Sequence, residues 1–504
     1  MQTIGLLGLL WTTAVAAPTG NEEIDQWIHA ERQGRHLTAS AGLYGILREG
    51  NYPEQDDVVN YHLAQALMSM GMEHSAQNHL METVRRGPKG ENFRIAVTKL
   101  ITLAERNDSN AELLRFVDKI DAGIFPRKAQ DHIYYLQGLK HLDDDELTAA
   151  THSFDKVRKT SAVASRAIYH TGVIHNETGR LNKAVRAFKE VSTRPLRVHH
   201  REDDAALQSL AVMAMARIHF GVDQYETAQK LYAKVPQESV YWPESMFELA
   251  WANYRDPSPD LPRTLGILLA LESPHFSDEY LPEAPLLRSL SLYSLCYWDE
   301  VDEVLDTYTD EWAEVIGDID GLMSDYPPDQ RKLLADQFYD DVMVSGKLGD
   351  QPQLLRRILR NKDLNGRVKT LNRLDAEIAS IETQKQLWQV EVGNALIDQI
   401  QQDRIRHKRA AGKILMKQLL AQRGNLERLV GEAAIIRFES VDNQREGLDR
   451  RITHPDVPPF EATTIDHAVN NELVNWPFNG EFWWDELPYY RYVLPPVCGL
   501  NGDV

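Results

Sequence analysis

The chain has 504 residues, of which 43% are hydrophobic and 26% are charged. This balance excludes a disordered protein, because a chain without a core carries fewer apolar side chains for each charge. The formal net charge of −20 argues against general binding to nucleic acid, because an acidic surface repels a polyanion.

Residues 1–17 have the features of a secretory signal peptide. An uncharged apolar run extends from Ile4 to Trp11, and Ala14 and Ala16 stand at the spacing of a cleavage site. The run is too short to span a bilayer, and no cysteine follows the cleavage site to carry a lipid anchor. We therefore expect export, with a buried N-terminal helix as the alternative, and then a helical segment over residues 18–56.

A pattern of small and aromatic residues recurs over residues 57–310. Its units are Gly138, Ala150, Phe154; then, 34 residues later, Gly172, Ala184, Phe188; then Ala216, Ala228, Tyr232; and, earlier in the chain, Ala64, Ala76, Leu80. Small residues on two consecutive helices let the helices approach closely, and the aromatic side chain fills the gap to the next pair. Each pair leaves an apolar side that only a neighbouring pair covers, so the pairs are expected to stack.

This spacing resembles the tetratricopeptide repeat (TPR) family. The resemblance implies an all-α chain whose repeats form an α-solenoid with a concave groove for a peptide. It also implies which side chains line that groove, at three positions relative to the small residue of each first helix. The residues three positions before the small residue are Tyr135, Tyr169, Met213 and Phe247. Those one position after it are Leu139, Val173, Arg217 and Trp251, and those four positions after it are Leu142, Asn176, Phe220 and Tyr254.

The implied groove is apolar and aromatic, with few side chains that would clamp a carboxylate. Such a surface suits an apolar strand or helix. Two occupants stay open at this point. The groove receives another protein, or it receives this chain's own aromatic tail or long helix, which has a high effective concentration.

A helical connector over residues 311–365 is expected to lead into a coiled coil over residues 366–452. Residues 366–451 contain no proline, and apolar residues there alternate at spacings of three and four: Leu371, Leu374, Ile378, Ile381, with Trp388 returning to the same seam. Either one long helix or a hairpin fits, with Gly412 or Gly424-Asn425 as the expected turn. A coiled coil also makes a homo-oligomer one of the functional alternatives.

The tail, residues 453–504, begins with a proline-rich connector and is then dense in aromatic residues. These are Trp476, Phe478, Phe482, Trp483, Trp484, Tyr489, Tyr490 and Tyr492. Exposed aromatics at this density aggregate, so the tail is expected to dock on another surface.

The sequence has two cysteines, Cys296 and Cys498. In an oxidising compartment they would pair and tie the tail to the helical body. The alternative, which we favour from sequence alone, is a buried thiol at Cys296 and a free one at Cys498, because sequence does not place the two within bonding distance.

The enzyme motifs that sequence can test are absent: no phosphate-binding loop, no dinucleotide fingerprint, no HExxH and no nucleophile elbow. The acidic run from Asp143 to Glu146 falls where a helical hairpin needs a polar turn. The run from His199 to Asp204 has metal-ligand residue types, but its spacing matches no closed site, so a charged insertion is the favoured interpretation. We expect no cofactor and no metal.

The signal, the repeats, the coiled coil and the ending from Trp476 to Leu487 together resemble periplasmic repeat proteins of Gram-negative bacteria linked to gliding machinery and envelope assembly. The resemblance implies a periplasmic or outer-membrane-associated adaptor. The sequence therefore predicts a non-enzymatic scaffold that binds envelope proteins. The alternatives are a structural coiled-coil homo-oligomer and a helical-repeat enzyme acting on the cell wall.

Overall fold

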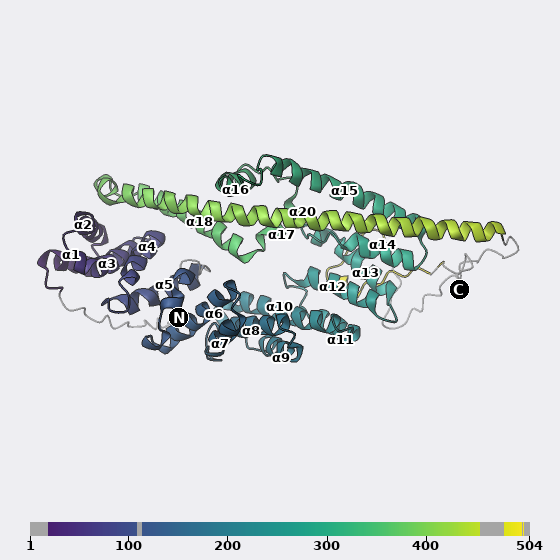
Figure 1. Cartoon of the computed structure of the whole chain (residues 1–504), viewed down its shortest axis with the longest axis horizontal. Helices are drawn as coiled ribbons and strands as arrows, with labels where there is room; N and C mark the ends of the chain where they lie inside the picture. The colour runs from purple at the N-terminus through teal and green to yellow at the C-terminus, as the bar shows by residue number, and fades with distance from the viewer. Residues whose placement is uncertain (1–18, 108–112, 454–477, 496, 498–504) are drawn as a thin grey trace, which may run out of the picture. The chain divides into compact units, whose positions relative to one another are not determined.

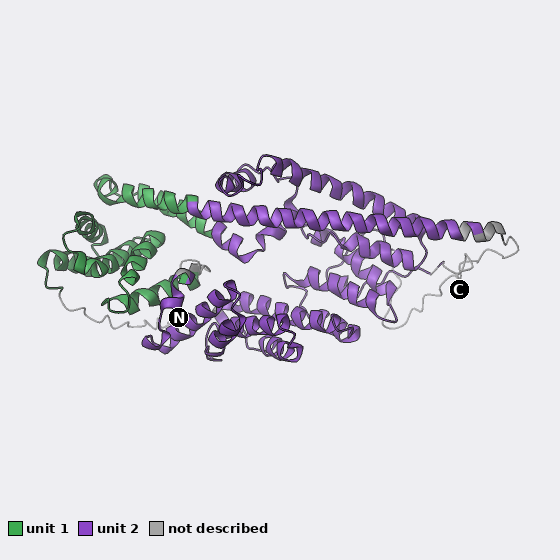
Figure 2. Cartoon of the chain, viewed as in Figure 1, with its two compact units in different colours: residues 1–113, 369–405 green, residues 114–368, 406–504 purple. Residues whose placement is uncertain are grey.

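The computed structural model describes residues 19–107, 113–453, 478–495 and 497, and these are mostly helical with no strand among them (Figure 1). The expected signal peptide, Trp476 and Cys498 lie outside the described residues. The chain divides into two compact units (Figure 2). Unit 1 comprises residues 1–113 and 369–405, and unit 2 comprises residues 114–368 and 406–504.

Unit 1 contains the N-terminal helices, each of which packs on the next along the chain. Their bounds are α1 Glu22–Arg32, α2 His36–Glu49, η1 Pro53–Gln55, α3 Asp56–Ser69, α4 Glu73–Arg85 and α5 Phe93–Asn107. The later part of unit 1 is a hairpin, made by the end of α18 (Lys362–Glu382), α19 (Gln386–Trp388), a π-helical turn η7 (Gln389–Gly393) and the start of α20 (Asn394–Thr453).

Unit 2 continues the series of packed consecutive helices. The short helix η2 (Leu113–Arg115) lies at the boundary of the units. The helices that follow it in unit 2 are η3 Val117–Lys119, η4 Ala122–Ile124, α6 Arg127–Asp143, α7 Leu147–Asp155, α8 Ala164–Glu177, α9 Leu181–Ser192, η5 Val198–His200, α10 Arg201–Phe220, α11 Tyr225–Tyr232, α12 Trp242–Arg255, α13 Leu261–Leu271, η6 Pro274–Phe276, α14 Ala284–Ser294, α15 Trp298–Ser324, α16 Ala335–Met343, α17 Pro352–Leu359 and η8 Leu487–Tyr489. The expected connector, residues 311–365, is thus the end of α15 with α16 and α17.

The same turn closes six of the helix pairs. In each, the residue two positions before the second helix has a positive φ: Gly34 76°, Gly71 80°, Asp145 61°, Gly179 70°, Asp223 59° and Cys296 63°. The next residue then donates its N–H back to the first helix, as Arg180 does to the carbonyl of His175 over 2.7 Å. This left-handed turn satisfies carbonyls at the helix end and reverses the chain. The acidic run at Asp143–Glu146 is one of these turns, as its composition predicts.

The small residues of the repeat pattern lie where helices approach most closely. A Cβ atom on Gly138 in α6 would overlap the ring of Phe154 in α7, and one on Gly172 in α8 would stand 2.8 Å from Phe188 in α9. Ala150 and Ala184, the small residues of the second helices, are fully buried. The aromatic side chain of each pair therefore rests on the backbone of the first helix.

The C-terminal hairpin does not turn where the glycines predict. The break falls at residues 383–385, between α18 and α19, whereas α20 is continuous through both Gly412 and Gly424. At Gly412 a Cβ would overlap the carbonyl oxygen of Ala335. This glycine is therefore required for a close approach of α16 to α20 and does not form a turn.

Candidate functional site

The twelve side chains that the TPR resemblance assigns to a groove lie at three different depths in unit 2. Those three positions before the small residue are mostly internal: Tyr135 is 3% exposed, Met213 0% and Phe247 9%. Tyr135, for example, packs against Phe154 and His170 with ring centroids 6.0 and 6.2 Å away. These three residues belong to the helix cores and do not present their side chains to a partner, which corrects the expectation from sequence.

The positions one and four residues after the small residue stay accessible. Leu139, Leu142, Val173, Phe220, Trp251 and Tyr254 are partly buried, as is Tyr169, while Asn176 and Arg217 are exposed. Sequence reasoning therefore placed two of the three positions on an accessible face.

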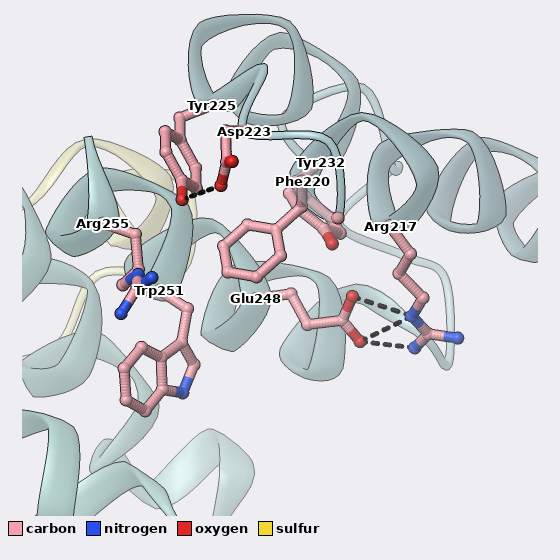
Figure 3. Close-up of a pocket in the computed structure, with 9 residues that line it drawn as sticks. Arg217, Phe220, Asp223, Tyr225, Tyr232, Glu248, Trp251 and Arg255 are labelled. Atoms are coloured by element: carbon pink, nitrogen blue, oxygen red, sulfur yellow. Dashed lines mark hydrogen bonds and ion pairs between the residues drawn. The ribbon is translucent and has the colours of Figure 1, made fainter. Parts of the chain in front are cut away.

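Some of these accessible residues meet in a cavity of about 590 Å³ between α10, α11 and α12 (Figure 3). It is lined by Arg217, Phe220, Gly221, Asp223, Tyr225, Tyr232, Glu248, Trp251 and Arg255. Arg217, Phe220 and Trp251 were expected from the repeat phase. The pattern missed Tyr225, Tyr232 and Arg255, because it assigns ligand contacts to first helices only and ends one residue before Arg255.

The ion pairs at the cavity wall fix the guanidinium of Arg217. Its Nε donates to both carboxylate oxygens of Glu248 over 3.0 and 2.9 Å, and its Nη2 lies 3.0 Å from Glu244. Burial opposes the charge on Arg217, but the hydrogen bonds and charges of the two glutamates outweigh it and raise the pKa of the guanidinium. Arg217 is thus committed to the protein and is not free to clamp a ligand.

The other polar groups of the cavity differ in their availability. The hydroxyl of Tyr225 donates to Asp223 over 2.5 Å, and burial, with the charge of Glu248, raises the pKa of Tyr232. The exposed Arg255 has neither an ion pair nor a side-chain hydrogen bond within the residues that the structure covers. Arg255 lines the cavity together with Trp251 (Figure 3). The cavity therefore offers apolar aromatic walls and one uncommitted cation.

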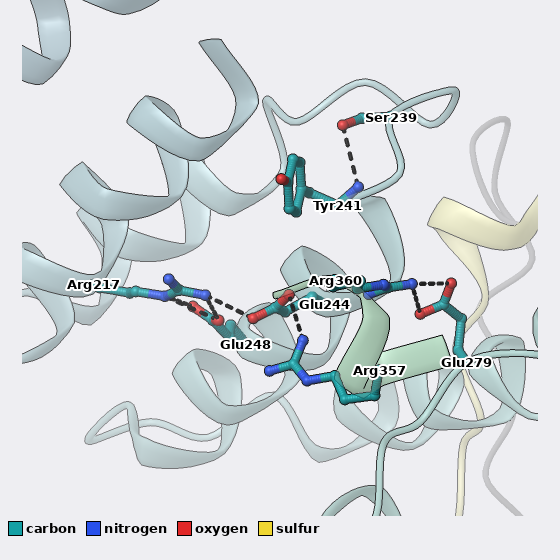
Figure 4. Close-up of polar contacts among 8 residues, drawn as sticks. All are labelled: Arg217, Ser239, Tyr241, Glu244, Glu248, Glu279, Arg357 and Arg360. Carbon is teal, nitrogen blue, oxygen red and sulfur yellow. Dashed lines mark hydrogen bonds and ion pairs between the residues drawn. The ribbon is translucent and has the colours of Figure 1, made fainter. Parts of the chain in front are cut away.

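A basic helix from the expected connector contacts the other side of the same ion-pair cluster (Figure 4). In or next to α17, Arg357 lies 3.5 Å from Glu244, and Arg360 donates to both oxygens of Glu279 over 2.8 and 2.7 Å. Arg356 pairs with Asp278. Leu354 and Ile358 on the other face are buried. The sequence predicts only a helical connector here and no contacts for it, although Leu354 and Ile358, four residues apart with Arg356 and Arg357 between them, indicate an amphipathic helix.

The described tail, residues 478–495, docks on unit 2, and we call it the strap. Leu487 is fully buried in the cluster that also contains Trp242 and Phe247. The ring of Trp484 lies 6.3 Å from Trp242 and 5.9 Å from Phe276. No strap residue lines the cavity, so the strap and the cavity are separate features of unit 2.

Main-chain contacts bind the strap along its length. A Cβ on Gly266 in α13 would overlap the carbonyl of Tyr490. The N–H of Tyr492 donates to Pro262 over 2.8 Å, and the hydroxyl of Tyr297 donates to the carbonyl of Pro495 over 2.9 Å. Arg491 pairs with Asp260 over 2.7 Å.

Cys296 is disulfide-bonded, so its interpretation as a buried thiol does not hold. The other cysteine of the sequence, Cys498, lies outside the described residues. The N–H of Val497 donates to the carbonyl of Leu295 over 3.1 Å. Pairing between Cys296 and Cys498 stays a prediction, which this hydrogen bond supports because it joins their immediate neighbours.

The charged run from His199 to Asp204 forms a local ion pair at the start of α10. Arg197 Nη2 lies 2.7 Å from Asp204 Oδ1. Burial would raise the pKa of Asp204, but the hydrogen bonds from Arg197 outweigh it and lower that pKa. Across the described ranges no cluster of three or more metal-ligating side chains occurs, and no helix there is both long and apolar enough to cross a bilayer.

Comparison with known proteins adds no relative: no family model matches the chain, and no curated protein matches it.

Proposed function

We propose that the chain is an exported, non-enzymatic scaffold whose TPR-like helix pairs bind a segment of another protein. The observation that carries this proposal is the cavity between α10 and α12, which keeps Phe220 and Trp251 accessible on walls held by the Arg217 ion pairs. Aromatic side chains around a preformed hollow are typical of peptide recognition. The repeated left-handed turn and the glycine–phenylalanine contacts support the assignment of the pairs to the TPR type.

The ligand that fits the cavity offers an apolar side chain to Phe220 and Trp251 and a carboxylate to Arg255. Arg255 supplies the charge, because the other charged lining groups pair within the protein. An occupant from another molecule is favoured over the described part of the chain's own tail, because the strap lies outside the cavity lining. The disulfide at Cys296 supports an oxidising compartment, and hence the periplasmic or outer-membrane-associated location that the sequence resemblance implies.

The proposal is tested with the full-length protein as bait in an envelope extract of its source cell. We expect Trp251→Ser together with Arg255→Glu to lose a specific partner that the wild type retains. Val240→Ser together with Lys332→Glu is the matched control, because it changes an exposed apolar residue and an exposed cation elsewhere in unit 2. Circular dichroism verifies helicity in all three proteins. Recovery of the same partners by wild type and cavity variant rejects the proposal.

A specific observation also supports the second candidate, a homo-oligomer formed through α20. Ile435, Phe438 and Val441 are 59%, 72% and 49% exposed and stand at intervals of three residues. These side chains spread over a broad side of the helix and do not follow the alternation of three and four that a coiled-coil seam has, but exposed apolar residues on a long helix are a surface on which another helix can pack. If this candidate holds, light scattering shows a dimer or higher state that Phe438→Glu converts to a monomer. A wild-type monomer at all concentrations rejects it.

A further inference from the structure

We propose that the outer face of the strap is a second docking surface, and that its partner is a protein segment rich in arginine or lysine. The surface shares no residue with the cavity lining, although Leu487 of the strap and Tyr232 of the cavity belong to one apolar cluster, so it is a second surface. Its aromatic side chains and its uncompensated negative charge together carry the proposal.

The strap is held along its inner side by contacts with α12, α13 and the loops that precede these two helices. Leu487 is fully buried, and the main chain at Tyr490 lies directly on Gly266 of α13. Arg491 pairs with Asp260, and Gln237 donates to the carbonyl of Trp484. A segment held in this way loses little conformational freedom when a partner binds.

The outward side chains of the strap are unusually aromatic. Phe478 is 45% exposed, Trp483 54%, Tyr489 76% and Tyr492 42%. These four residues fall within fifteen positions of a docked segment whose one helical turn is η8. The few residues that carry most of the binding energy in protein interfaces are enriched in tryptophan and tyrosine, and contiguous exposed apolar groups mark such surfaces.

The exposed charges of the strap are negative and unbalanced. Glu481, Asp485 and Glu486 are exposed, and none has an ion pair within the residues described. Arg491, the cation of the described strap, is already paired with Asp260. A guanidinium or ammonium group would pair with these carboxylates and pack over the neighbouring indole and phenol rings.

Other occupants fit this face less well. Anionic lipid and nucleic acid are repelled by the three carboxylates. A second copy of the chain carries a net charge of −20, and three cations of its basic stretch, Arg404–Lys413, are already paired. In that stretch Arg404 pairs with Asp375 over 2.7 Å, Lys408 with Asp340 over 2.6 Å and Arg409 with Asp336 over 3.4 Å. A basic segment of a different protein is the occupant that the charges favour.

The test uses the full-length, disulfide-intact protein and a short fluorescein-labelled peptide of alternating arginine and glycine. A peptide of alternating glutamate and glycine is the charge-reversed probe. We expect Trp483→Ser with Tyr489→Ser to weaken binding of the arginine peptide about tenfold, measured by fluorescence anisotropy. Val344→Ser with Leu333→Ser, which removes two similarly exposed apolar side chains on either side of α16 in unit 2, leaves binding within about twofold.

The charge is tested by Glu481→Gln with Asp485→Asn and Glu486→Gln, for which we expect about tenfold weaker binding at low salt. The matched control is Glu300→Gln with Glu303→Gln and Asp310→Asn, three exposed carboxylates of α15. Equal loss in this control means that only net charge attracts the peptide, and the proposal fails.

Three further results would overturn the proposal. One is equal binding of the glutamate peptide. Another is that the protein does not bind the arginine peptide but binds phosphatidylcholine vesicles, and that this vesicle binding requires Trp483 and Tyr489. That result would assign the surface to a membrane. The third is self-association lost on Trp483→Ser, which would assign it to a second copy.

Discussion

In unit 1 the C-terminal hairpin is joined to the N-terminal helices by buried polar groups, whereas in unit 2 the later part of α20 is joined by apolar packing with ion pairs at its edge. Glu377 in α18, 6% exposed, accepts hydrogen bonds from the N–H groups of His74 and Ser75 over 2.7 and 2.9 Å. It thereby caps the N-terminus of α4 with a side chain from about 300 residues away in the sequence.

Other polar contacts extend this junction within unit 1. Asp403 in α20 is 5% exposed and lies 2.8 Å from Nε2 of His74, and it also accepts from Asn78 over 3.0 Å. The indole N–H of Trp388 donates to the hydroxyl of Ser40 over 2.9 Å. These groups satisfy one another only in one register of the hairpin.

The contacts of α20 in unit 2 are of another kind. Leu429 and Ala433 pack in an apolar cluster with Leu305 and Tyr308 of α15. The ion pair of Arg423 with Asp320, 2.7 Å long, lies at the surface. Apolar packing tolerates small shifts, whereas a buried hydrogen bond is lost by one residue of slippage. The comparison indicates that buried hydrogen bonds set the register of the long helices, and that packing of apolar side chains stabilises their association.

The largest effect is expected at Glu377. Its replacement by alanine leaves two N–H groups and the Ser75 hydroxyl buried without an acceptor. We expect the free energy of unfolding of unit 1 to fall by about 4 kcal/mol. Urea titration gives the value, and hydrogen exchange of α4 assigns it to unit 1. The matched change Glu283→Ala in unit 2 removes an exposed partner of Arg428 and should cost less than about 1 kcal/mol. Equal costs for the two variants would remove the distinction between the units.

Acid should weaken unit 1 through His79. Its Nδ1 lies 2.8 Å from Oδ1 of Asn60, its Nε2 is buried with no hydrogen-bond partner, and burial lowers its pKa to about 4. The unfolded histidine takes up a proton near its ordinary pKa of about 6.5, while the folded one does not until about pH 4. Stability is therefore full above pH ~6.5 and falls as the pH drops toward 4, by about 3 kcal/mol in total.

Urea titrations between pH 7 and pH 4 measure this slope. His79→Gln should remove most of the contribution of this residue, whereas His29→Gln, which changes an exposed histidine of the same unit, should not. In unit 2 burial first, and then Lys362 and Arg166, lower the pKa of His170 to about 4 as well. Its replacement tests whether acid weakens both units. A slope unchanged by His79→Gln would show that the ring is solvated.

Much of the helical fold follows from the sequence, and particular residues show where inference from sequence ends. The pattern at Gly138 and Gly172 predicts helix pairs, because a small residue on one helix makes room for the aromatic side chain of the next helix. Periodicity alone does not say which face a later segment covers. The sequence therefore predicts Tyr135, Phe247 and Trp251 alike as residues of the groove, although only Trp251 of these three is accessible. The contacts of Glu377 and α17 join distant segments, and no local spacing encodes them.

The helix pairs themselves provide the next test of the comparison. Gly138→Ala forces a methyl group into the ring of Phe154, and we expect a loss of about 2 kcal/mol in the stability of unit 2. In unit 1 the corresponding residue is already Ala64, fully buried, with Leu80 in place of the aromatic. Ala64→Gly should cost about 1 kcal/mol, through helix propensity and a small void. Thermal unfolding measures both. Tolerance of Gly138→Ala would mean that the phenylalanine does not rest on the glycine backbone.

The smallest effect is expected at Gly424, and it has the opposite sign. This glycine lies within α20 and has no atom within 4 Å of the position that a Cβ would occupy. Alanine there should stabilise unit 2 by about 1 kcal/mol, because it is the better helix former. Gly412→Ala in the same helix should instead destabilise, because the methyl group overlaps the carbonyl of Ala335. Thermal unfolding of the two variants therefore separates a continuous α20 from a hairpin turning at Gly424, in which alanine would be destabilising at the left-handed position of the turn.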